Sequence, residues 1–327
     1  MSVRLTLATS AGLCIPETGV IGVFGVTPDF DLSSLPQDRV ELILRHKPFF
    51  DHFNGLGWRV ATESSQRYAT AVVALPRAKS AAQAVIWHAL DQTDGPIVVD
   101  GLKSDGIDSI LKAVRTKVDV FGPVSKAHGK LFWFNATPDM FDAWRPMQTT
   151  LDNGMVTAPG CFSADGPDPA SVLLLESLPE KLGKRCADLG AGWGYLAAHI
   201  LKREGVQVLH LIEADFSALE CAQQNVPDPR AQFHWADARS WEPEERLDAV
   251  IMNPPFHTGR TAEPGLGQAF IASAAGALAP HGTLWMVANR HLPYETSIAS
   301  HFRNWQEITS DNRFKVLRAT RPSRHRR

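Results

Sequence analysis

The sequence predicts an α/β protein made of two successive domains, each built on a mostly parallel sheet. Its 327 residues exceed the usual size of one compact domain. Strand-like and helix-like segments alternate through both halves, as they do in parallel α/β sheets. Between the halves, residues 141–169 contain four prolines and three glycines, a composition typical of a linker. We therefore predict domains at residues 1–145 and 146–327.

The composition is that of a soluble globular protein, with 44% hydrophobic and 21% charged residues. No apolar run approaches the roughly 20 residues that span a bilayer, so we expect no membrane segment. The N-terminal apolar stretch 5–15 is interrupted by Thr and Ser and follows a single arginine, unlike a secretion signal. The four cysteines have neither metal-ligand nor disulfide spacing. We expect a cytoplasmic protein without a metal.

Charge is distributed unevenly along the chain. Residues 151–312 contain 11 Lys/Arg and 20 Asp/Glu, a balance of −9, whereas residues 313–327 contain seven Lys/Arg and no acid. A basic tail on an acidic domain fits two interpretations equally well. It could be an arm that binds nucleic-acid phosphates, or a solvated terminus.

The first half has no strand that runs into a nucleoside-type glycine loop opening a helix. Gly22–Gly25 comes closest, but Pro28 follows it where the helix should start. We therefore expect the first domain to lack a cofactor site. Its expected helices are 39–54 and 81–90, and its expected strands are 20–26, 58–62, 71–75, 97–99, 118–121 and 131–135.

The second half repeats the alternation more clearly. Its expected strands are 185–189, 206–212, 232–235, 247–252 and 283–288, followed by a closing hairpin of 305–309 and 314–318. Its expected helices are 195–203, 216–225 and 268–278.

The most informative motif is Asp188-Leu-Gly190-Ala-Gly192-Trp-Gly194, which follows a strand and opens a helix. Glycines allow the backbone to turn sharply and to approach a ligand closely. The spacing is G-x-G-x-G rather than the G-x-G-x-x-G of dinucleotide sites. An acid at Asp188 could anchor an ammonium group, which S-adenosylmethionine has and NAD lacks; the alternative is that Asp188 only caps the loop.

Three further acids follow the next two strands. Glu213 ends the second strand, where a carboxylate can accept hydrogen bonds from both ribose hydroxyls of a nucleoside. Asp215 is a rival for that role. Asp237 follows the third strand, where it could meet an adenine amino group or be an ordinary turn aspartate.

The segment Asn253-Pro254-Pro255-Phe256 ends the fourth strand, at the edge where doubly wound sheets bind ligands. The Asn253 side chain and the Pro254 backbone each offer a carbonyl acceptor, the prolines stiffen the loop, and Phe256 offers a stacking face. Such a site fits a planar NH2 group, which a dehydrogenase does not need. A structural turn is the alternative interpretation.

Together these motifs resemble the bacterial ribosomal RNA guanine-N2 methyltransferases, most closely the family acting on small-subunit 16S RNA. The resemblance covers most of residues 155–320 and, more loosely, the first half through Ile97–Ile107. The segments that carry it are Pro159–Ser163, Asp188–Gly194, Asn253–His257, Val287–Asn289 with Leu292–Tyr294, and Arg313–Val316.

The resemblance implies two tandem methyltransferase-like, Rossmann-type domains with seven-stranded sheets, the first having lost its cofactor site. It implies S-adenosylmethionine as cofactor and small-subunit ribosomal RNA, free or in an assembly intermediate, as the partner of a monomeric enzyme. The implied catalytic residues are Asn253, Pro254, Pro255 and Phe256. The implied cofactor contacts are Phe162, Asp188, Gly190, Ala191, Gly192, Gly194, Glu213, Ala214, Asp237, Ala238 and Asn253.

The Asn-Pro-Pro-Phe motif is shared with adenine-N6 and protein-glutamine methyltransferases, so alone it predicts only an amino-nitrogen acceptor. A catalytically idle ribosome-assembly factor is a third possibility, against which the intact glycine and acceptor loops argue. His257 could accept the departing proton or be a structural histidine.

Overall fold

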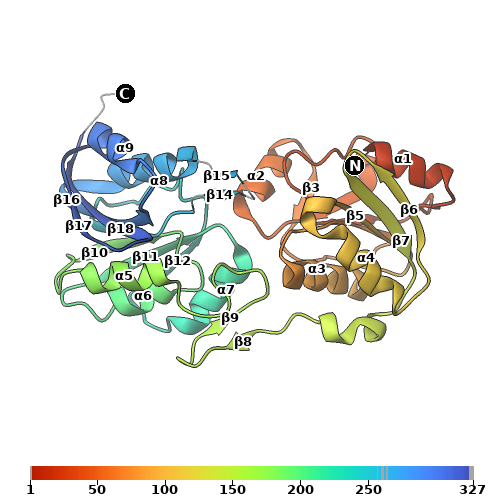
Figure 1. Cartoon of the computed structure of the whole chain (residues 1–327), viewed down its shortest axis with the longest axis horizontal. Helices are drawn as coiled ribbons and strands as arrows, with labels where there is room; N and C mark the ends of the chain where they lie inside the picture. Colours follow the sequence, from red (N-terminus) through yellow and green to blue (C-terminus); the bar gives the residue numbers. More distant parts are fainter. Residues whose placement is uncertain (1, 256, 259–260, 263, 324–327) are drawn as a thin grey trace. The chain divides into compact units, whose positions relative to one another are not determined.

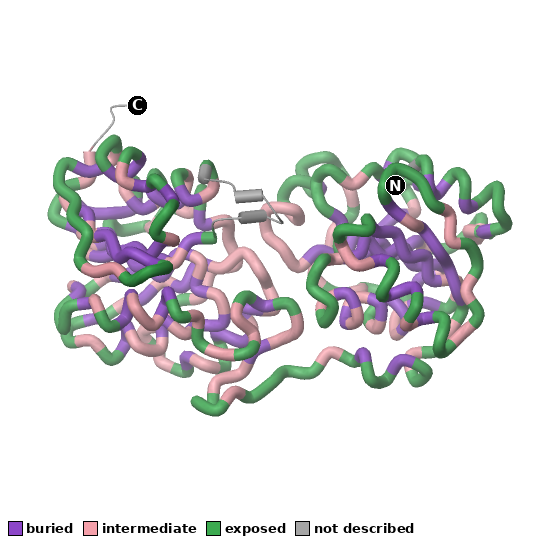
Figure 2. The backbone as a smooth tube through the Cα atoms, viewed as in Figure 1, coloured by how far each residue is buried: buried purple, intermediate pink, exposed green. Residues whose placement is uncertain are grey.

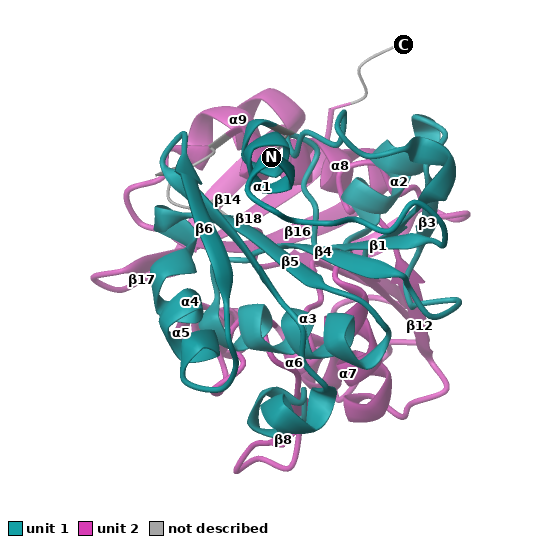
Figure 3. Cartoon of the chain, turned by 90° about the vertical axis from the view of Figure 1, so that its right-hand side faces the viewer, with its two compact units in different colours: residues 1–148 teal, residues 149–327 magenta. Residues whose placement is uncertain are grey.

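The computed structural model describes residues 2–255, 257–258, 261–262 and 264–323. The chain divides into two compact units, Met1–Gln148 and Thr149–Arg327, hereafter unit 1 and unit 2 (Figure 3). This division lies close to the boundary that we expected after residue 145. None of the helices in the described ranges is long and apolar enough to cross a membrane.

Unit 1 contains a seven-stranded sheet in the order β3-β2-β1-β4-β5-β7-β6 (Figure 1). The first five strands of that order pair in parallel, and β7 and β6 are antiparallel. The strands are β1 (Ile21–Phe24), β2 (Val40–Ile43), β3 (Arg59–Ala61), β4 (Thr70–Ala74), β5 (Ile97–Leu102), β6 (Phe121–Lys126) and β7 (Gly129–Phe134). The helices are α1 (Ser2–Ser10), α2 (Lys47–Gly55), α3 (Lys79–Asp91) and α4 (Ile107–Arg115), with 3-10 turns at Gln37–Arg39, Lys103–Asp105 and Pro138–Trp144.

Unit 2 repeats this topology in a second seven-stranded sheet, ordered β12-β11-β10-β13-β16-β18-β17. The strands are β10 (Arg185–Leu189), β11 (Val208–Glu213), β12 (Ala231–Trp235), β13 (Leu247–Met252), β16 (Leu278–Asn289), β17 (Phe302–Ser310) and β18 (Phe314–Pro322). Two short hairpins join β8 (Thr149–Thr150) to β9 (Val156–Thr157) and β14 (His257–Thr258) to β15 (Thr261–Ala262). The helices are α5 (Pro169–Ser177), α6 (Tyr195–Ile200), α7 (Phe216–Asn225), α8 (Pro264–Ala277) and α9 (Tyr294–His301).

Both sheets are buried along their central strands, as Figure 2 shows. All five residues of β4 are buried, and β10 and β13 are almost entirely so. Parallel strands covered on both faces require such continuous apolar runs. In unit 2, residues of α5, α6 and α7 pack on one face, whereas residues of α8 and α9 pack on the other. The prediction of two α/β domains with mostly parallel seven-stranded sheets is confirmed.

One helix prediction is wrong. The segment Arg39–Asn54 was expected to be a single helix, but Val40–Ile43 forms strand β2, and the helix begins only at Lys47. The apolar run there is short and fully buried between two parallel neighbours, so helical spacing within it was accidental. Pro48 fits the first turn of the helix that follows. Helices α1, α4, α5 and α9 were not predicted from the sequence, and β6 was placed too early.

The topology determines where chemistry is possible in unit 2. Strands β10, β11, β13 and β16 are parallel, so their carboxyl ends lie at one edge of the sheet. Strand β18 is antiparallel to β16, so its first residue, Phe314, lies at the same edge beside Asn289. Ligands of doubly wound sheets bind at this edge.

Candidate functional site

The glycine loop between β10 and α6 is held open and shaped by its backbone. The N–H groups of Gly190 and Ala191 both donate to the carbonyl of Ile212 in the neighbouring strand, at 2.9 and 3.0 Å. Gly190 and Gly192 adopt φ values of 77° and 56°, a region that favours glycine. A Cβ atom on Gly192 would meet nothing within 4 Å. Open space therefore lies in front of the loop.

Glu213 ties the glycine loop to the end of β11. Its Oε2 accepts the Gly192 N–H at 2.7 Å, and its Oε1 accepts the Asp215 N–H at 2.8 Å. Burial raises the pKa of the Glu213 carboxyl to about 7, although these backbone donors lower it. Asp215, the predicted rival, instead caps α7 by accepting the Ser217 N–H at 2.8 Å. The structure thus gives these two acids different roles.

Asp188 is completely enclosed at the end of β10, with no exposed surface. Neither carboxyl oxygen has a hydrogen-bond partner of ordinary geometry among the described residues. Burial raises its pKa to about 8, the Glu213 charge adds to this, and the nearby Ala197 N–H opposes it. Asp188 does not line the cavity in front of the loop. Glu213 does not line that cavity either, and the contact of Asp188 with a ligand's ammonium group stays a prediction.

Three other predicted cofactor residues lie apart from this cavity. The carboxylate of Asp237 is paired with Arg239, at 2.6 Å, rather than free to meet an adenine. Ala238 is buried in the core against α8, and its carbonyl accepts the Ser273 hydroxyl at 2.6 Å. The Ala214 carbonyl accepts the indole N–H of Trp235 at 2.8 Å. In this structure the contacts of these three residues are made within the protein and stabilise its fold.

Asn253 directly follows β13, and its side-chain orientation is fixed. Its Nδ2 donates to Oδ2 of Asp168 at 2.8 Å and to Oγ of Ser171 at 2.9 Å. A carboxylate oxygen can only accept hydrogen bonds, so the amide nitrogen must face Asp168. The Oδ1 atom is left as an acceptor without a hydrogen-bond donor among the described residues. This oxygen is the carbonyl acceptor that the sequence predicted at Asn253.

Two adjoining cavities meet at Asn253. One is lined by the glycine loop and the start of α6, and the other by the ends of β13, β16 and β18. Phe162, Asp168 and Asn253 line both cavities. Phe162 is 59% exposed, and its carbonyl accepts the indole N–H of Trp193 in the glycine loop at 3.0 Å. The acceptor amide therefore lies between a place for a cofactor and a place for a substrate.

The rest of the Asn-Pro-Pro-Phe segment is described only in part. Pro254 is buried and lines the second cavity, whereas Pro255 is exposed. Phe256 lies outside the described residues, and of His257 only the backbone is described, in β14. The basic residues 324–327 also lie outside the described part of the chain.

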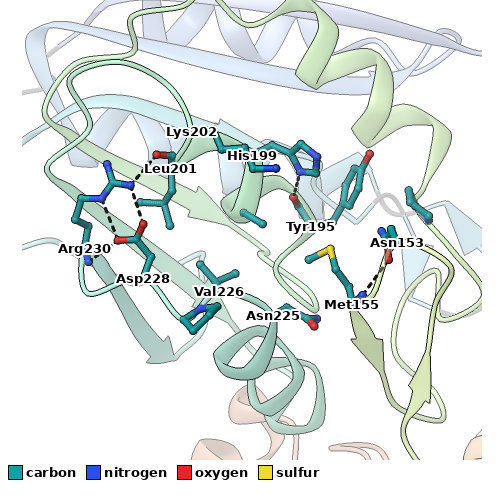
Figure 4. Close-up of a pocket in the computed structure, with 13 residues that line it drawn as sticks. Asn153, Met155, Tyr195, His199, Leu201, Lys202, Asn225, Val226, Asp228 and Arg230 are labelled. Carbon is teal, nitrogen blue, oxygen red and sulfur yellow. Dashed lines mark hydrogen bonds and ion pairs between the residues drawn. The ribbon is translucent and has the colours of Figure 1, made fainter.

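A larger groove of about 690 Å³ lies between the ends of α6 and α7 and the β8–β9 hairpin (Figure 4). It contains none of the predicted site residues. Its Arg230 is committed to Asp228 at 2.7 Å and to the carbonyls of Leu201 and Val206. Size alone therefore does not identify the site.

Asp168 and Ser171 were not predicted from the sequence, and Tyr294 was named only within the segment Leu292–Tyr294 that carries the resemblance. Asp168 was detectable as a helix cap, because an Asp before Pro169 is a common helix start, and its carboxylate accepts the Ser171 N–H at 3.0 Å. Its link to Asn253, 85 positions away, was not detectable. Tyr294 is 1% exposed, lines the second cavity, and its hydroxyl has no hydrogen-bond partner among the described residues.

The sheet order, glycine loop and acceptor amide define a methyltransferase, and residues 152–318 match the family model of the methyltransferase small domain. The chain belongs to that family. It is 32% identical over 236 residues to ribosomal RNA small subunit methyltransferase C of Hahella chejuensis, which covers 68% of each chain. The relative of the same name from Shewanella halifaxensis is 29% identical over 77% of each chain. Within the methyltransferases, this chain is therefore a member of the small subunit methyltransferase C family.

A solved structure covers both units. The 16S rRNA N2 methyltransferase (RsmC) of T. thermophilus, in complex with AdoMet and guanosine, superposes with a TM-score of 0.78 at 25% identity. The match covers 94% of this chain and 90% of that chain. The tandem arrangement of two methyltransferase-like sheets is thus shared with a known enzyme.

S-adenosylmethionine, the cofactor of this family, fits the site of this chain. The open space before Gly192 would be filled by any side chain at that position, so the loop forms a cradle for a ligand. The unpaired, buried Asp188 favours a ligand that carries positive charge. The Glu213 carboxylate accepts a hydrogen bond from the Gly192 N–H of the loop, and its oxygens are acceptors available for ribose hydroxyls. A cationic nucleoside satisfies all three features.

Proposed function

We propose that this chain methylates the exocyclic N2 amino group of a guanine in 16S ribosomal RNA, with S-adenosylmethionine as methyl donor. The observation that carries the proposal is the fixed amide of Asn253. Because both of its N–H groups are engaged by Asp168 and Ser171, its Oδ1 is presented as an acceptor between the two cavities. The names of the relatives and the solved RsmC complex with AdoMet and guanosine support the choice of guanine and 16S RNA.

In this mechanism, S-adenosylmethionine supplies an electrophilic methyl group. Asn253 Oδ1 and the Pro254 carbonyl accept the two N–H groups of the guanine amine, so that its lone pair faces the glycine loop. The N–CH3 bond forms as the S–CH3 bond breaks, and the amine proton leaves afterwards to water or a nearby base. Positioning of this kind can contribute about 7–11 kcal/mol to catalysis. Neither a protein nucleophile nor a metal is required.

We further propose that unit 1 has no cofactor site and supports substrate binding. We also propose that the enzyme is a cytoplasmic monomer and that its substrate is the RNA of the small subunit or of an assembly intermediate. The target base must leave its stack to reach Asn253. The second cavity can accommodate this base only if it belongs to a single-stranded or flipped nucleotide.

Transfer of isotope-labelled methyl groups to small subunits lacking the modification, followed by nucleoside analysis, tests the proposal. We expect label in N2-methylguanosine. Label in N6-methyladenosine or in a protein glutamine would replace the proposed acceptor. Absence of transfer despite measurable S-adenosylmethionine binding would favour an assembly factor. The Asn253→Ala variant is the matched control for activity that depends on the site.

A further inference from the structure

The second cavity continues into a groove of about 430 Å³ at the same sheet edge. This groove is lined by Asn289, Arg290, His291, Asn312 and Arg313. Asn289 and Arg313 also line the cavity that contains Asn253 and Pro254. The groove is thus continuous with the acceptor site rather than a separate surface feature. It is built from the end of β16 and the turn that precedes β18.

The two segments that form this groove are fastened to each other. The Arg290 N–H donates to the Arg313 carbonyl at 2.8 Å, and the Arg290 guanidinium donates to the Asp311 carbonyl at 3.0 Å. Oδ1 of Asp311 accepts the N–H groups of Arg313 and Phe314 at 2.7 and 2.6 Å. The turn is therefore pre-organised, and a ligand does not need to order it on binding.

The arginines of the groove remain available for a ligand. Arg290 and Arg313 are exposed, and neither forms an ion pair with any described residue. The neighbouring Lys315, by contrast, is buried and engaged by Glu295 and the Leu292 carbonyl. The backbone N–H groups of Phe314 and Arg313 lower the pKa of Asp311, and the charges of Arg313 and Arg290 add to this. The Asp311 charge offsets one of the two arginine charges. One net positive charge and several N–H donors thus face the groove.

This charge stands out because residues 151–312, which form most of unit 2, hold 11 Lys/Arg against 20 Asp/Glu. An RNA substrate would be repelled by most of such a surface. Phosphate groups next to the target nucleotide require a local cationic contact, and planar guanidinium groups match them well. Asn289, His291 and Asn312 add hydrogen-bonding side chains to the same groove.

We infer that this groove, formed by Arg290, Arg313 and their three neighbours, binds the RNA phosphates adjacent to the guanine held at Asn253. The inference rests on the proposed function, because it takes RNA as the substrate. It adds a binding site within unit 2 that fixes the backbone of the target nucleotide while Asn253 holds the base. Phosphate contacts of this kind position a nucleic acid without reading its sequence.

The test compares Arg290→Gln/Arg313→Gln with Arg303→Gln in the full chain. Arg303 is an exposed arginine of β17, next to Phe302 at the opposite edge of the sheet, and has no ion pair among the described residues. Binding of a 16S RNA fragment is measured over a series of KCl concentrations, and S-adenosylmethionine binding is measured by calorimetry. The double variant should bind RNA roughly tenfold or more weakly, with a salt slope lower by about one to two units. Its S-adenosylmethionine affinity should be unchanged.

An unchanged salt slope in the double variant would overturn the inference, as would an equal loss in Arg303→Gln. These measurements require no methyl transfer. If the labelled product were not N2-methylguanosine, the proposed function would fail while the binding result for the groove could still be interpreted. Circular dichroism and thermal unfolding of the variants would identify any that misfolds. A single Arg290→Gln change, which leaves the backbone bonds of the turn in place, then provides a second test with a smaller decrease in slope.

Discussion

Units 1 and 2 have the same strand order, yet three polar residues at the carboxyl edge of the unit 2 sheet have apolar counterparts in unit 1. The strand registers align Val23 with Asp188, and Ala74 with Asn253. By the same registers, Leu44 in unit 1 corresponds to Glu213, the last residue of β11 in unit 2. All three unit 1 residues are buried and apolar. The two units thus keep the same scaffold but differ at the three positions that carry polar side chains in unit 2.

The glycine loops differ in the same way. Gly25 in unit 1 adopts φ 73°, close to the 77° of Gly190 in unit 2. A Cβ on Gly25 would lie 2.9 Å from the Ala74 carbonyl oxygen, whereas one on Gly190 would lie 3.5 Å from the Phe270 ring and one on Gly192 would meet nothing within 4 Å. The loop of unit 1 is therefore closed against its own sheet. A left-handed glycine alone does not make a ligand site; the space in front of it does.

Buried acids also separate the units. In unit 1, Asp100 is 2% exposed and is paired in bidentate fashion with Arg4, at 2.6 and 2.7 Å. In unit 2, Asp188 is 0% exposed and has no cationic partner. A buried charge is costly unless paired. Unit 1 meets this cost with Arg4 within its own fold, whereas in unit 2 burial raises the pKa of the unpaired Asp188 to about 8.

We expect the largest effect when Asn253 of unit 2 is replaced by alanine, the residue at the equivalent position Ala74 of unit 1. Asn253→Ala should lower the rate of methyl transfer by roughly 10²–10³-fold, the scale for one preorganised polar group at a reacting centre. S-adenosylmethionine affinity should stay within a few-fold, because the amide acts on the substrate amine as its geometry changes. Single-turnover transfer with saturating RNA and calorimetry measure the two quantities. Parallel losses of rate and affinity would make Asn253 a cofactor ligand instead.

Replacing Glu213 by leucine, the residue at the equivalent position Leu44 of unit 1, should affect cofactor binding instead. Glu213→Leu should weaken S-adenosylmethionine binding by about 1.5–3 kcal/mol, the usual scale for charged hydrogen bonds, which is roughly 10- to 150-fold. The loss includes the support that Glu213 gives to the Gly192 N–H. Calorimetry on the wild type should show one binding site per chain; a second site would contradict the proposal that unit 1 has none.

A smaller effect is expected from Asp168, which acts through Asn253. Asp168→Ala should reduce turnover by about tenfold, because one hydrogen bond to the Asn253 amide is lost while that to Ser171 remains. It should also destabilise the protein by about 1 kcal/mol through loss of the helix cap. Asp168→Ser retains a cap and an acceptor, so it should recover stability and part of the rate. Recovery of stability without any recovery of rate would exclude a positioning role.

The sequence predicted those parts of the protein that depend on local pattern. Apolar runs gave most strands, and the glycine loop and Asn253–Phe256 were located because their residue types are unusual in that context. Val40–Ile43 was misassigned, because a short buried run looks alike in a strand and a helix. The Asp168–Asn253 bond and the pairing of Asp237 with Arg239 were not predictable, because they depend on which side chains the fold brings together.

The last and smallest effect concerns stability. In wild type, burial raises the pKa of Asp188 to about 8, well above its value in an unfolded chain. The native state then holds a proton that the unfolded state has lost, so the stabilising contribution is greatest at low pH and disappears as the pH rises towards 8. The slope from this group is up to about 1.4 kcal/mol per pH unit between roughly pH 5 and 8.

Asp188→Val, which copies Val23, removes this group and replaces it with an apolar side chain. In the absence of cofactor the variant should therefore lose less stability than wild type between pH 5.5 and 8, and should be the more stable protein at pH 8. Its S-adenosylmethionine affinity should fall, since a cationic ligand favours ionisation of the buried Asp188 carboxyl and a valine has no group to ionise. Urea denaturation at several pH values and calorimetry at pH 7 give both quantities. Equal pH slopes in the two proteins would mean that Asp188 is ionised in the native state and that a partner stabilises its charge. Asp188 would then not be an unpaired buried acid, and the contrast with Asp100 of unit 1 would disappear.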